Sequence, residues 1–256
     1  MAEPVRTRDV IETGPRHTPA EVIRLNTRFA NAGPAELLRA ALTERLTGRT
    51  AIVSSFGAES AVLLHMVASI DPATPVIFLD TLKHFPETLA YRDQLIARLG
   101  LTDVRTVRPD PERLAARDAT ELRWSYDPDG CCDIRKVEPL ARALADFDAN
   151  VSGRKGFQSA TRTHIPFFEM DTSDAYGRIK INPLAGWTKT DLDAYFEAHD
   201  LPRHPLEEEG YLSIGCSPCT SVVREGEDPR AGRWRGWDKV ECGIHTPAEG
   251  PDQPSF

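Results

Sequence analysis

Short apolar segments alternate with amphipathic segments along most of this chain, and that alternation limits the folds open to it. The apolar segments predict strands at residues 50–54, 75–79, 104–107, 150–152 and 178–181. The amphipathic segments predict helices near residues 21–31, 34–46, 58–68, 86–99, 111–119, 132–145 and 189–198. Because strands that alternate with helices are typical of α/β proteins, we expect a doubly wound, mostly parallel sheet.

The composition indicates a class of protein and argues against several partners. With 256 residues, 40% hydrophobic and 27% charged, the chain can form one large α/β domain with a short appendage. The formal net charge of -8 argues against binding to nucleic acid or to an anionic membrane surface. No apolar run approaches the roughly 18 residues of a membrane span, and the N-terminus lacks the apolar core of a secretion signal. We therefore expect a cytoplasmic protein, in which cysteines seldom form structural disulfides.

Residues 54–60 (SSFGAES) join the first predicted strand to the helix that follows it. Ligands of open α/β sheets bind beyond the carboxyl ends of the strands, where a helix N-terminus presents unpaired N–H groups to an anion. Gly57 lets the backbone approach an anion, and the candidate hydroxyl donors are Ser54, Ser55 and Ser60. The alternative is an ordinary turn whose serines only cap the helix. The glycine-rich loops of common nucleoside triphosphate and dinucleotide sites are absent from the sequence.

Four of the five cysteines form two pairs, Cys131 with Cys132 and Cys216 with Cys219. Four thiolates suit one [4Fe–4S] cluster, and they also suit a zinc ion. An adjacent Cys-Cys is unusual for zinc, and this C-x-x-C does not follow the first strand as it does in thioredoxin-like proteins. Buried apolar cysteines are a further interpretation, which fits poorly with the charged and glycine neighbours. Lys136 lies one helical turn after Cys132, where it can face both a cluster and an anion.

The fifth cysteine, Cys242, lies alone near the C-terminus in the segment ECGIH, residues 241–245. A cysteine on a glycine-containing tail is expected to be exposed and mobile, which suits a nucleophile that visits two places. Lys239 and His245 favour its thiolate form, whereas Glu241 opposes it. The alternative is an incidental surface thiol.

Basic residues gather in two places that could neutralise an anionic substrate. The first follows the fourth predicted strand and the second follows the C-x-x-C; together they contain Arg154, Lys155, Arg162, Arg224, Arg230, Arg233 and Arg235. Arginine suits bidentate binding of phosphate and sulfate groups. The alternative for each of them is a solvated charged surface.

In this order, the motifs resemble those of the assimilatory sulfonucleotide reductases, in particular the branch that acts on adenosine 5′-phosphosulfate. The segments that carry the resemblance are SSFGAES, LDTLKHFPET, CCDIRK, SGRKGFQSATR, GCSPCT, RAGRWRG and ECGIH, spread over about residues 40–245. The first resembles the PP-loop of adenine-nucleotide hydrolases, with Phe56 and Glu59 where Gly and Asp are usual. The branch that acts on the 3′-phosphorylated nucleotide usually lacks the four paired cysteines. The resemblance therefore implies the PP-loop type of α/β fold and favours the substrate without the 3′-phosphate.

The resemblance also implies a mechanism and a cofactor. The four paired cysteines would hold one [4Fe–4S] cluster, and Cys242 would attack the sulfur of adenosine 5′-phosphosulfate to form a Cys S-sulfonate and AMP. Sulfite release would need a thiol donor, thioredoxin or a glutaredoxin-like protein. The implied substrate-binding residues are Ser54, Ser55, Gly57, Ser60, Lys136, Arg154, Arg162, Arg230 and Arg233, supported by Glu241 and His245. Members of the family form homodimers or homotetramers.

These observations divide the chain into four segments. We expect a loose N-terminus at residues 1–17, an α/β nucleotide-binding domain at 18–200, a cluster-binding and arginine-rich segment at 201–238 packed on it, and a mobile tail at 239–256 that carries the catalytic cysteine. Three other functions stay open at this point. They are a reductase of the 3′-phosphorylated nucleotide or of both nucleotides, a PP-loop tRNA-thiolating enzyme, and a metal-stabilised redox-sensing or binding module.

Overall fold

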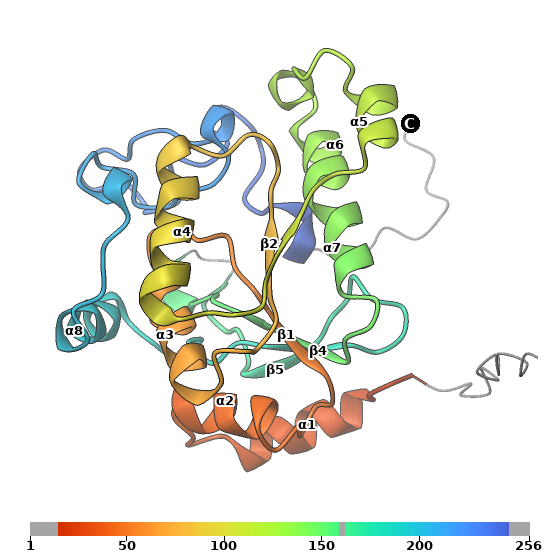
Figure 1. The fold of residues 1–256 in the computed structure, drawn as a ribbon, viewed down its shortest axis with the longest axis vertical. Helices are drawn as coiled ribbons and strands as arrows, with labels where there is room; N and C mark the ends of the chain where they lie inside the picture. Colours follow the sequence, from red (N-terminus) through yellow and green to blue (C-terminus); the bar gives the residue numbers. More distant parts are fainter. Residues whose placement is uncertain (1–14, 159–161, 246–256) are drawn as a thin grey trace, which may run out of the picture.

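A six-stranded sheet forms the centre of the part of the chain that the computed structural model describes, residues 15–158 and 162–245 (Figure 1). Its strands are β1 (Thr50–Val53), β2 (Val76–Leu79), β3 (Val104–Val107), β4 (Ala149–Ser152), β5 (Phe168–Met170) and β6 (Ile179–Ile181). They lie in the order β3-β2-β1-β4-β6-β5. Every pair of neighbours is parallel except β5 with β6. The predicted mostly parallel sheet is therefore confirmed.

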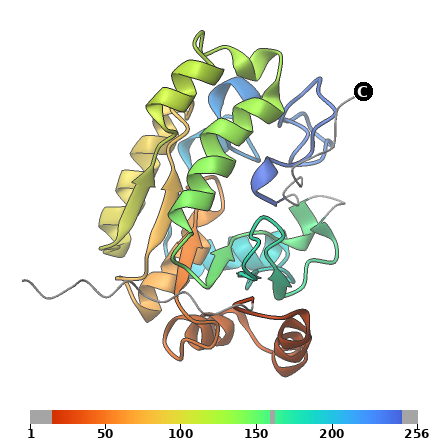
Figure 2. The same ribbon diagram turned by 90° about the vertical axis from the view of Figure 1, so that its right-hand side faces the viewer.

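Helices cover both faces of the sheet, which makes the fold doubly wound (Figure 2). The helices are α1 (Pro19–Arg28), α2 (Pro34–Leu42), α3 (Ser60–Ile70), α4 (Pro86–Leu99), α5 (Pro111–Arg117), α6 (Pro128–Cys132), α7 (Glu138–Ala143) and α8 (Lys189–Ala198). Strand β2 shows how the two faces are filled, because successive strand side chains point to opposite sides. Val76 and Phe78 belong to the larger core beneath α3 and α4, whereas Ile77 and Leu79 pack in a second core with Leu140 of α7.

The predicted helix at residues 132–145 differs from the structure in its start and in its regularity. The helix begins four residues earlier, with Pro128 in the first turn and the carboxylate of Asp127 accepting from the amide of Gly130. A π-helical turn, Asp133–Val137, follows directly after the cysteine pair and precedes α7. Pro139 explains it, because proline cannot donate the amide hydrogen bond that a regular α-helix requires there. The turn changes the direction of the side chains that follow the cysteines.

The edge strand β5 was missing from the sequence prediction. It has only three residues, and it is defined by its pairing with β6 rather than by a pattern of its own. The other strands agree with the prediction to within a residue or so at each end. Most of residues 1–17 and of residues 239–256, expected to be loose or mobile, lie outside the described residues.

The segment after α8 has little regular structure and lies at the carboxyl ends of the strands. It contains short 3₁₀ turns at Pro205–Glu207 and Ser217–Cys219. A β-bridge joins Cys216 to His84, and a second bridge joins Thr220 to Arg233. In this way the segment is attached both to the loop after β2 and to itself. Within residues 15–158 and 162–245, no helix has the length and apolar character that a membrane crossing requires.

Candidate active site

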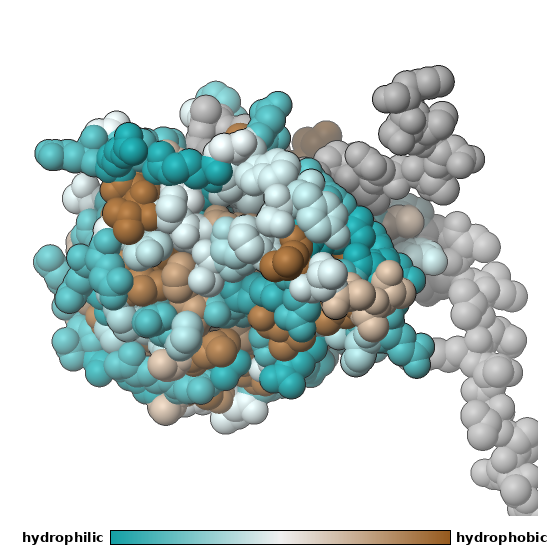
Figure 3. Space-filling model, turned by 90° about the horizontal axis from the view of Figure 1, so that it is seen from above, coloured by the Kyte–Doolittle hydropathy of each residue, from teal (hydrophilic) through white to brown (hydrophobic). Residues whose placement is uncertain are grey.

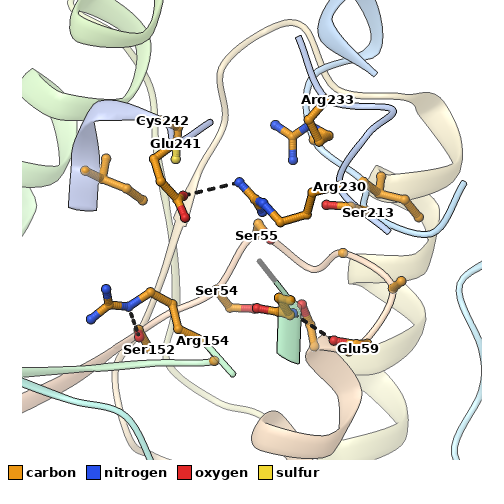
Figure 4. Close-up of a pocket in the computed structure, with 18 of the residues that line it drawn as sticks. Ser54, Ser55, Glu59, Ser152, Arg154, Ser213, Arg230, Arg233, Glu241 and Cys242 are labelled. Atoms are coloured by element: carbon orange, nitrogen blue, oxygen red, sulfur yellow. Dashed lines mark hydrogen bonds and ion pairs between the residues drawn. The ribbon is translucent and has the colours of Figure 1, made fainter. Parts of the chain in front are cut away.

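A pocket of about 230 Å³ opens beyond the carboxyl ends of β1 and β4. It collects the substrate-binding candidates from four separate parts of the chain: Ser54, Ser55, Gly57, Ser60, Lys136, Arg154, Arg162, Arg230 and Arg233. Cys216, Glu241 and Cys242 also line it. Figure 4 shows Cys242 and Glu241 on one side of this pocket and the strand-end serines on another. Seen from this end of the molecule, the surface is largely polar with separate apolar patches (Figure 3).

The loop after β1 exposes its backbone to the pocket because Phe56 turns its side chain into the core. Phe56 has a left-handed backbone conformation, with φ of 50°, and its ring packs edge-on against Phe78 at 5.5 Å. The hydroxyl of Ser54 accepts a hydrogen bond from the amide of Phe56 at 3.2 Å. At Gly57, a Cβ atom would lie 3.3 Å from the carbonyl oxygen of Ile214, so glycine allows that neighbouring loop to come close. The N-terminus of α3 is thereby open to an anion.

Two pocket residues outside the substrate-binding set that the resemblance implied form an ion pair beside this loop. The ammonium of Lys155 lies 2.8 Å from the carboxylate of Glu59, and the Lys155 side chain is only 4% exposed. Gln158 donates a second hydrogen bond to Glu59 at 2.9 Å. Burial lowers the pKa of Lys155, and Glu59 acts against that change. The pair ties the loop after β1 to the segment after β4, and the charges of both residues were visible in the motifs.

Cations outnumber carboxylates around the pocket, although the whole chain is acidic. The lining contains six Lys and Arg side chains, at 136, 154, 155, 162, 230 and 233, against two carboxylates, Glu59 and Glu241. Burial, followed by repulsion from Arg162, lowers the pKa values of Arg154 and Arg230 to about 10 each. Such mutual repulsion of desolvated cations favours an anionic ligand.

The arginines differ in what they contact. Arg154 pairs with Glu169 and also donates to Asn182 at 3.2 Å. Arg233 lines the pocket and its Nε is buried without a hydrogen-bond partner among the described residues. Two other candidates from the second basic segment, Arg224 and Arg235, do not line the pocket; Arg235 instead pairs with Glu227 at 2.8 Å.

Cys242 was expected to be exposed, but the structure buries it partly at the edge of the pocket. The short 3₁₀ turn that follows it, Gly243–His245, contacts the π-helical turn after the cysteine pair. Ile244 packs against the second core, which holds this part of the tail on the body of the protein. The side chain of His245 lies outside what the structure describes.

Lys136 connects Cys242 electrostatically to the paired cysteines. Burial alone would lower the pKa of Lys136, but the sulfurs of Cys216, Cys242 and Cys132 together raise it. The π-helical turn that carries Lys136 therefore brings its ammonium within electrostatic reach of both Cys242 and the paired cysteines. Such a cation can act on both an anion in the pocket and the sulfurs behind it.

The four paired cysteines come together although two of them lie far from the other two in sequence. All four are free thiols, and the three at positions 131, 132 and 216 are buried. Burial raises the pKa values of Cys132 and Cys219 to about 11, and nearby sulfurs contribute at both positions. Thr81 places its hydroxyl 3.2 Å from the sulfur of Cys216. Among the described residues, however, no group of three or more His, Cys, Asp or Glu side chains is arranged to hold a metal ion.

Comparison with known proteins points to one family. The model of the phosphoadenosine phosphosulfate reductase domain matches residues 49–222. An adenosine 5′-phosphosulfate reductase of Mesorhizobium japonicum is 51% identical over 227 residues, which cover 88% of this chain and 87% of the relative. An adenosine 5′-phosphosulfate reductase of Mycolicibacterium smegmatis is 42% identical over 85% of this chain and 90% of the relative.

Solved structures agree with these sequence matches. A phosphoadenylyl-sulfate reductase of Candida auris, solved as a phosphate complex, has a TM-score of 0.68 at 28% identity, covering 81% of this chain and 98% of that one. An FMN adenylyltransferase of Candida glabrata in complex with ATP has a TM-score of 0.53 at 14% identity over 90% of this chain and 77% of that one, and shows the shared fold alone. The site geometry and both kinds of comparison lead to one assignment: the chain belongs to the family of phosphoadenosine and adenosine 5′-phosphosulfate reductases.

Proposed function

We propose that this protein, an oxidoreductase by its family, reduces adenosine 5′-phosphosulfate to sulfite and AMP in assimilatory sulfate reduction. The observation that carries the proposal is the position of Cys242, which lies in one pocket with the loop after β1 and with six cationic side chains. A phosphosulfate group is anionic, so it can form charge-assisted hydrogen bonds with those cations. The two relatives at 51% identity over most of the chain are both named adenosine 5′-phosphosulfate reductase.

The excess of cations supports attack by a thiolate on an anionic group. At 4 Å, two like charges repel by about 4 kcal/mol at an effective dielectric constant near 20. Positively charged groups fixed around the sulfonate remove a barrier of that size, which corresponds to about three powers of ten in rate. In our proposal Ser54, Ser55, Gly57 and Ser60 bind the phosphosulfate, and Lys136, Arg154, Arg230 and Arg233 offset its charge.

The proposed reaction has two steps that balance. The thiolate of Cys242 attacks the sulfur atom, the bond from sulfur to the phosphate oxygen breaks, and AMP leaves from a Cys S-sulfonate. A thiolate of an external dithiol then attacks the Sγ of Cys242 and expels sulfite. The second thiol of that donor resolves the mixed disulfide, so the donor supplies both electrons. Thioredoxin or a glutaredoxin-like protein is the proposed donor, and the tail must move outward to meet it.

We further propose that the four paired cysteines hold one [4Fe–4S] cluster. Their chemistry fits, because all four are free thiols brought together in a mostly buried place. One buried donor, Nε of Arg135, lacks a hydrogen-bond partner among the described residues, and the side chain of Arg135 interacts with Cys131. A cluster would supply a sulfur acceptor for such a donor and tie the late segment to the α6 helix. Its chemistry there would be electrostatic and structural, and Lys136 would lie between it and the substrate.

Other features follow from the family resemblance as proposals. We propose a cytoplasmic enzyme, supported by the five free cysteines, and a homodimer or homotetramer. Light scattering of the purified protein tests the assembly. Iron and acid-labile sulfide in equal amounts in a brown protein would support the cluster, and bound zinc in a colourless protein would exclude it.

Sulfite release tests the activity and its substrate together. The purified protein is given adenosine 5′-phosphosulfate or its 3′-phosphorylated relative, each with and without thioredoxin. We expect thioredoxin-dependent sulfite from the first nucleotide, with a Cys242 S-sulfonate detected by mass spectrometry when the donor is omitted. Cys242→Ser should abolish sulfite release and keep nucleotide binding. Turnover that survives this substitution, or a preference for the 3′-phosphorylated nucleotide, would overturn the corresponding part of the proposal.

A further inference from the structure

Glu241, the residue directly before Cys242, binds two of the pocket arginines. Its carboxylate forms a bidentate pair with Arg162, with Oε1 at 2.6 Å from Nε and Oε2 at 2.7 Å from Nη2. Oε2 also lies 3.2 Å from Nη2 of Arg230, and the same Nη2 donates to the carbonyl of Val240 at 2.8 Å. Figure 4 shows Glu241 pointing into the pocket toward Arg230. We call this group, Glu241 with Arg162 and Arg230, the tail anchor.

The tail anchor is shielded from solvent, which strengthens it. The side chain of Arg162 is 8% exposed and that of Glu241 is 13% exposed. Burial opposes ionisation of Glu241, but Arg162 and Arg230 hold the pKa of its carboxyl below the usual range. Two parallel charge-assisted hydrogen bonds fix both the position and the direction of a carboxylate. The backbone of residue 241 is therefore held in place relative to the pocket.

All three nitrogens of Arg162 already donate hydrogen bonds in this arrangement, and the edge formed by Nε and Nη2 is taken up by the carboxylate of Glu241. Its third nitrogen, Nη1, donates to the side-chain oxygen of Gln158 at 2.7 Å. Gln158 in turn donates to Glu59, the residue at the start of α3 that pairs with Lys155. A continuous chain of polar contacts therefore connects the loop after β1 to the tail. Arg233 differs, because it lines the same pocket with a buried Nε that has no partner among the described residues.

We propose that Arg162 and Glu241 are positioning residues, whose ion pair places the thiol of Cys242 over the bound nucleotide rather than binding the nucleotide itself. This inference rests on the proposed function, because it takes Cys242 as the nucleophile. It changes the role that the sequence suggested for Arg162, from a substrate ligand to a tail ligand. Arg233 keeps the role of substrate ligand, and Arg230 contacts the tail at the mouth of the same pocket.

The test compares the same substitution at two arginines. Binding of adenosine 5′-phosphosulfate is measured by calorimetry in a Cys242→Ser background, and S-sulfonation of Cys242 is measured by single-turnover quench in the unsubstituted background. Arg162→Gln and Glu241→Gln should each slow S-sulfonation by about ten- to a hundred-fold, since small misplacement of a reacting group has effects of that order. Both should leave the Kd within about two-fold. Arg233→Gln, the matched control, should raise the Kd by about ten-fold or more.

Two further measurements separate positioning from a general structural effect. Without nucleotide, iodoacetamide should alkylate Cys242 faster in Glu241→Gln than in the parent, because the tail is released. The double variant Arg162→Gln/Glu241→Gln should be no slower than the slower single variant, because both changes remove one interaction. A Kd that rises for Arg162→Gln as much as for Arg233→Gln would refute the inference and leave the proposed function intact. If Cys242→Ser retained turnover, the proposed function itself would fail.

Discussion

Replacing Asp171 by Asn should destabilise the protein strongly without touching the pocket. Asp171 directly follows the edge strand β5 and does not line the pocket, and its side chain is 2% exposed. Its carboxylate lies 3.3 Å from both the ammonium of Lys180 and the guanidinium of Arg178, and it accepts a hydrogen bond from the side-chain Nδ2 of Asn150 at 2.9 Å. Asp174 also pairs with Arg178 at 2.9 Å. Among the described residues, the substitution therefore leaves the buried charge of Lys180 without a paired carboxylate.

The expected loss follows from the cost of an uncompensated buried charge. Removing one partner of a buried ion pair costs about 3–5 kcal/mol. For a chain of this size each kcal/mol lowers the melting temperature by about 2–4 °C, so the expected decrease is roughly 6–20 °C. Urea unfolding followed by circular dichroism gives the free energy of unfolding. The dependence of this free energy on urea concentration should be the same in both variants if their unfolded states are alike.

A matched substitution at an exposed ion pair provides the control. Asp103 and Arg105 lie 2.7 Å apart with side chains 33% and 49% exposed. Asp103→Asn makes the same chemical change, and its expected cost is about 0–1 kcal/mol because solvent screens the pair. If Asp171→Asn and Asp103→Asn lowered the free energy of unfolding by the same small amount, the reasoning would be refuted, because burial would then not affect how much an ion pair contributes to stability.

Three further outcomes are expected. Gly215→Ala should weaken nucleotide binding about ten- to a hundred-fold, measured by calorimetry, because a Cβ atom there would overlap the guanidinium of Arg233; unchanged affinity would contradict this. Lys155→Met should lower the free energy of unfolding by about 1–3 kcal/mol in urea titrations, because it removes the buried partner of Glu59; an unchanged free energy of unfolding would show that the cation does not stabilise Glu59. The stability difference between the parent and Asp171→Asn should shrink as the pH falls below about 4, the usual pKa of an unfolded Asp. Burial raises the pKa of Asp171, but Lys180, the hydrogen bonds from Ser173 and Arg178 together lower it, so the carboxylate stabilises the fold above that pH and loses this effect as the pH falls; a stability difference that stays constant down to about pH 2 would count against this.

Local sequence signals were enough for most elements of the fold. Strand β2 (VIFL) is a continuous apolar run, which identifies a strand buried on both faces, and β1 (TAIV) is rich in β-branched residues. Helices α1 and α8 begin at Thr18 and Thr188 with capping boxes, so their starts also depend on nearby residues alone. The edge strand β5 escaped prediction because its three residues become a strand only through contact with β6.

The irregular helix around the paired cysteines is an intermediate case. Pro139 was visible in the sequence and indicates a break, but the prediction continued one helix through it. A proline shows that one amide bond is missing; whether the helix kinks, ends or widens into a π turn depends on what packs around it. Here the widened turn contacts the tail segment Gly243–His245, which lies more than a hundred residues away in sequence.

By itself the sequence determined which chemical groups the protein has: the strand-end serines, the paired cysteines, the two groups of basic residues and the cysteine in ECGIH. Each of these depends on residue type and short spacing. The substrate-binding residues that the family resemblance implied all line one pocket, whereas Arg224 and Arg235 do not. Only the tertiary structure decided what each charge contacts. Arg162 and Arg233 are alike as residues, yet Arg162 binds Glu241, whereas the buried Nε of Arg233 has no hydrogen-bond partner in the part of the chain that the structure describes. The charge of a side chain follows from the residue type, whereas the group that it pairs with depends on which distant segments the fold brings into contact.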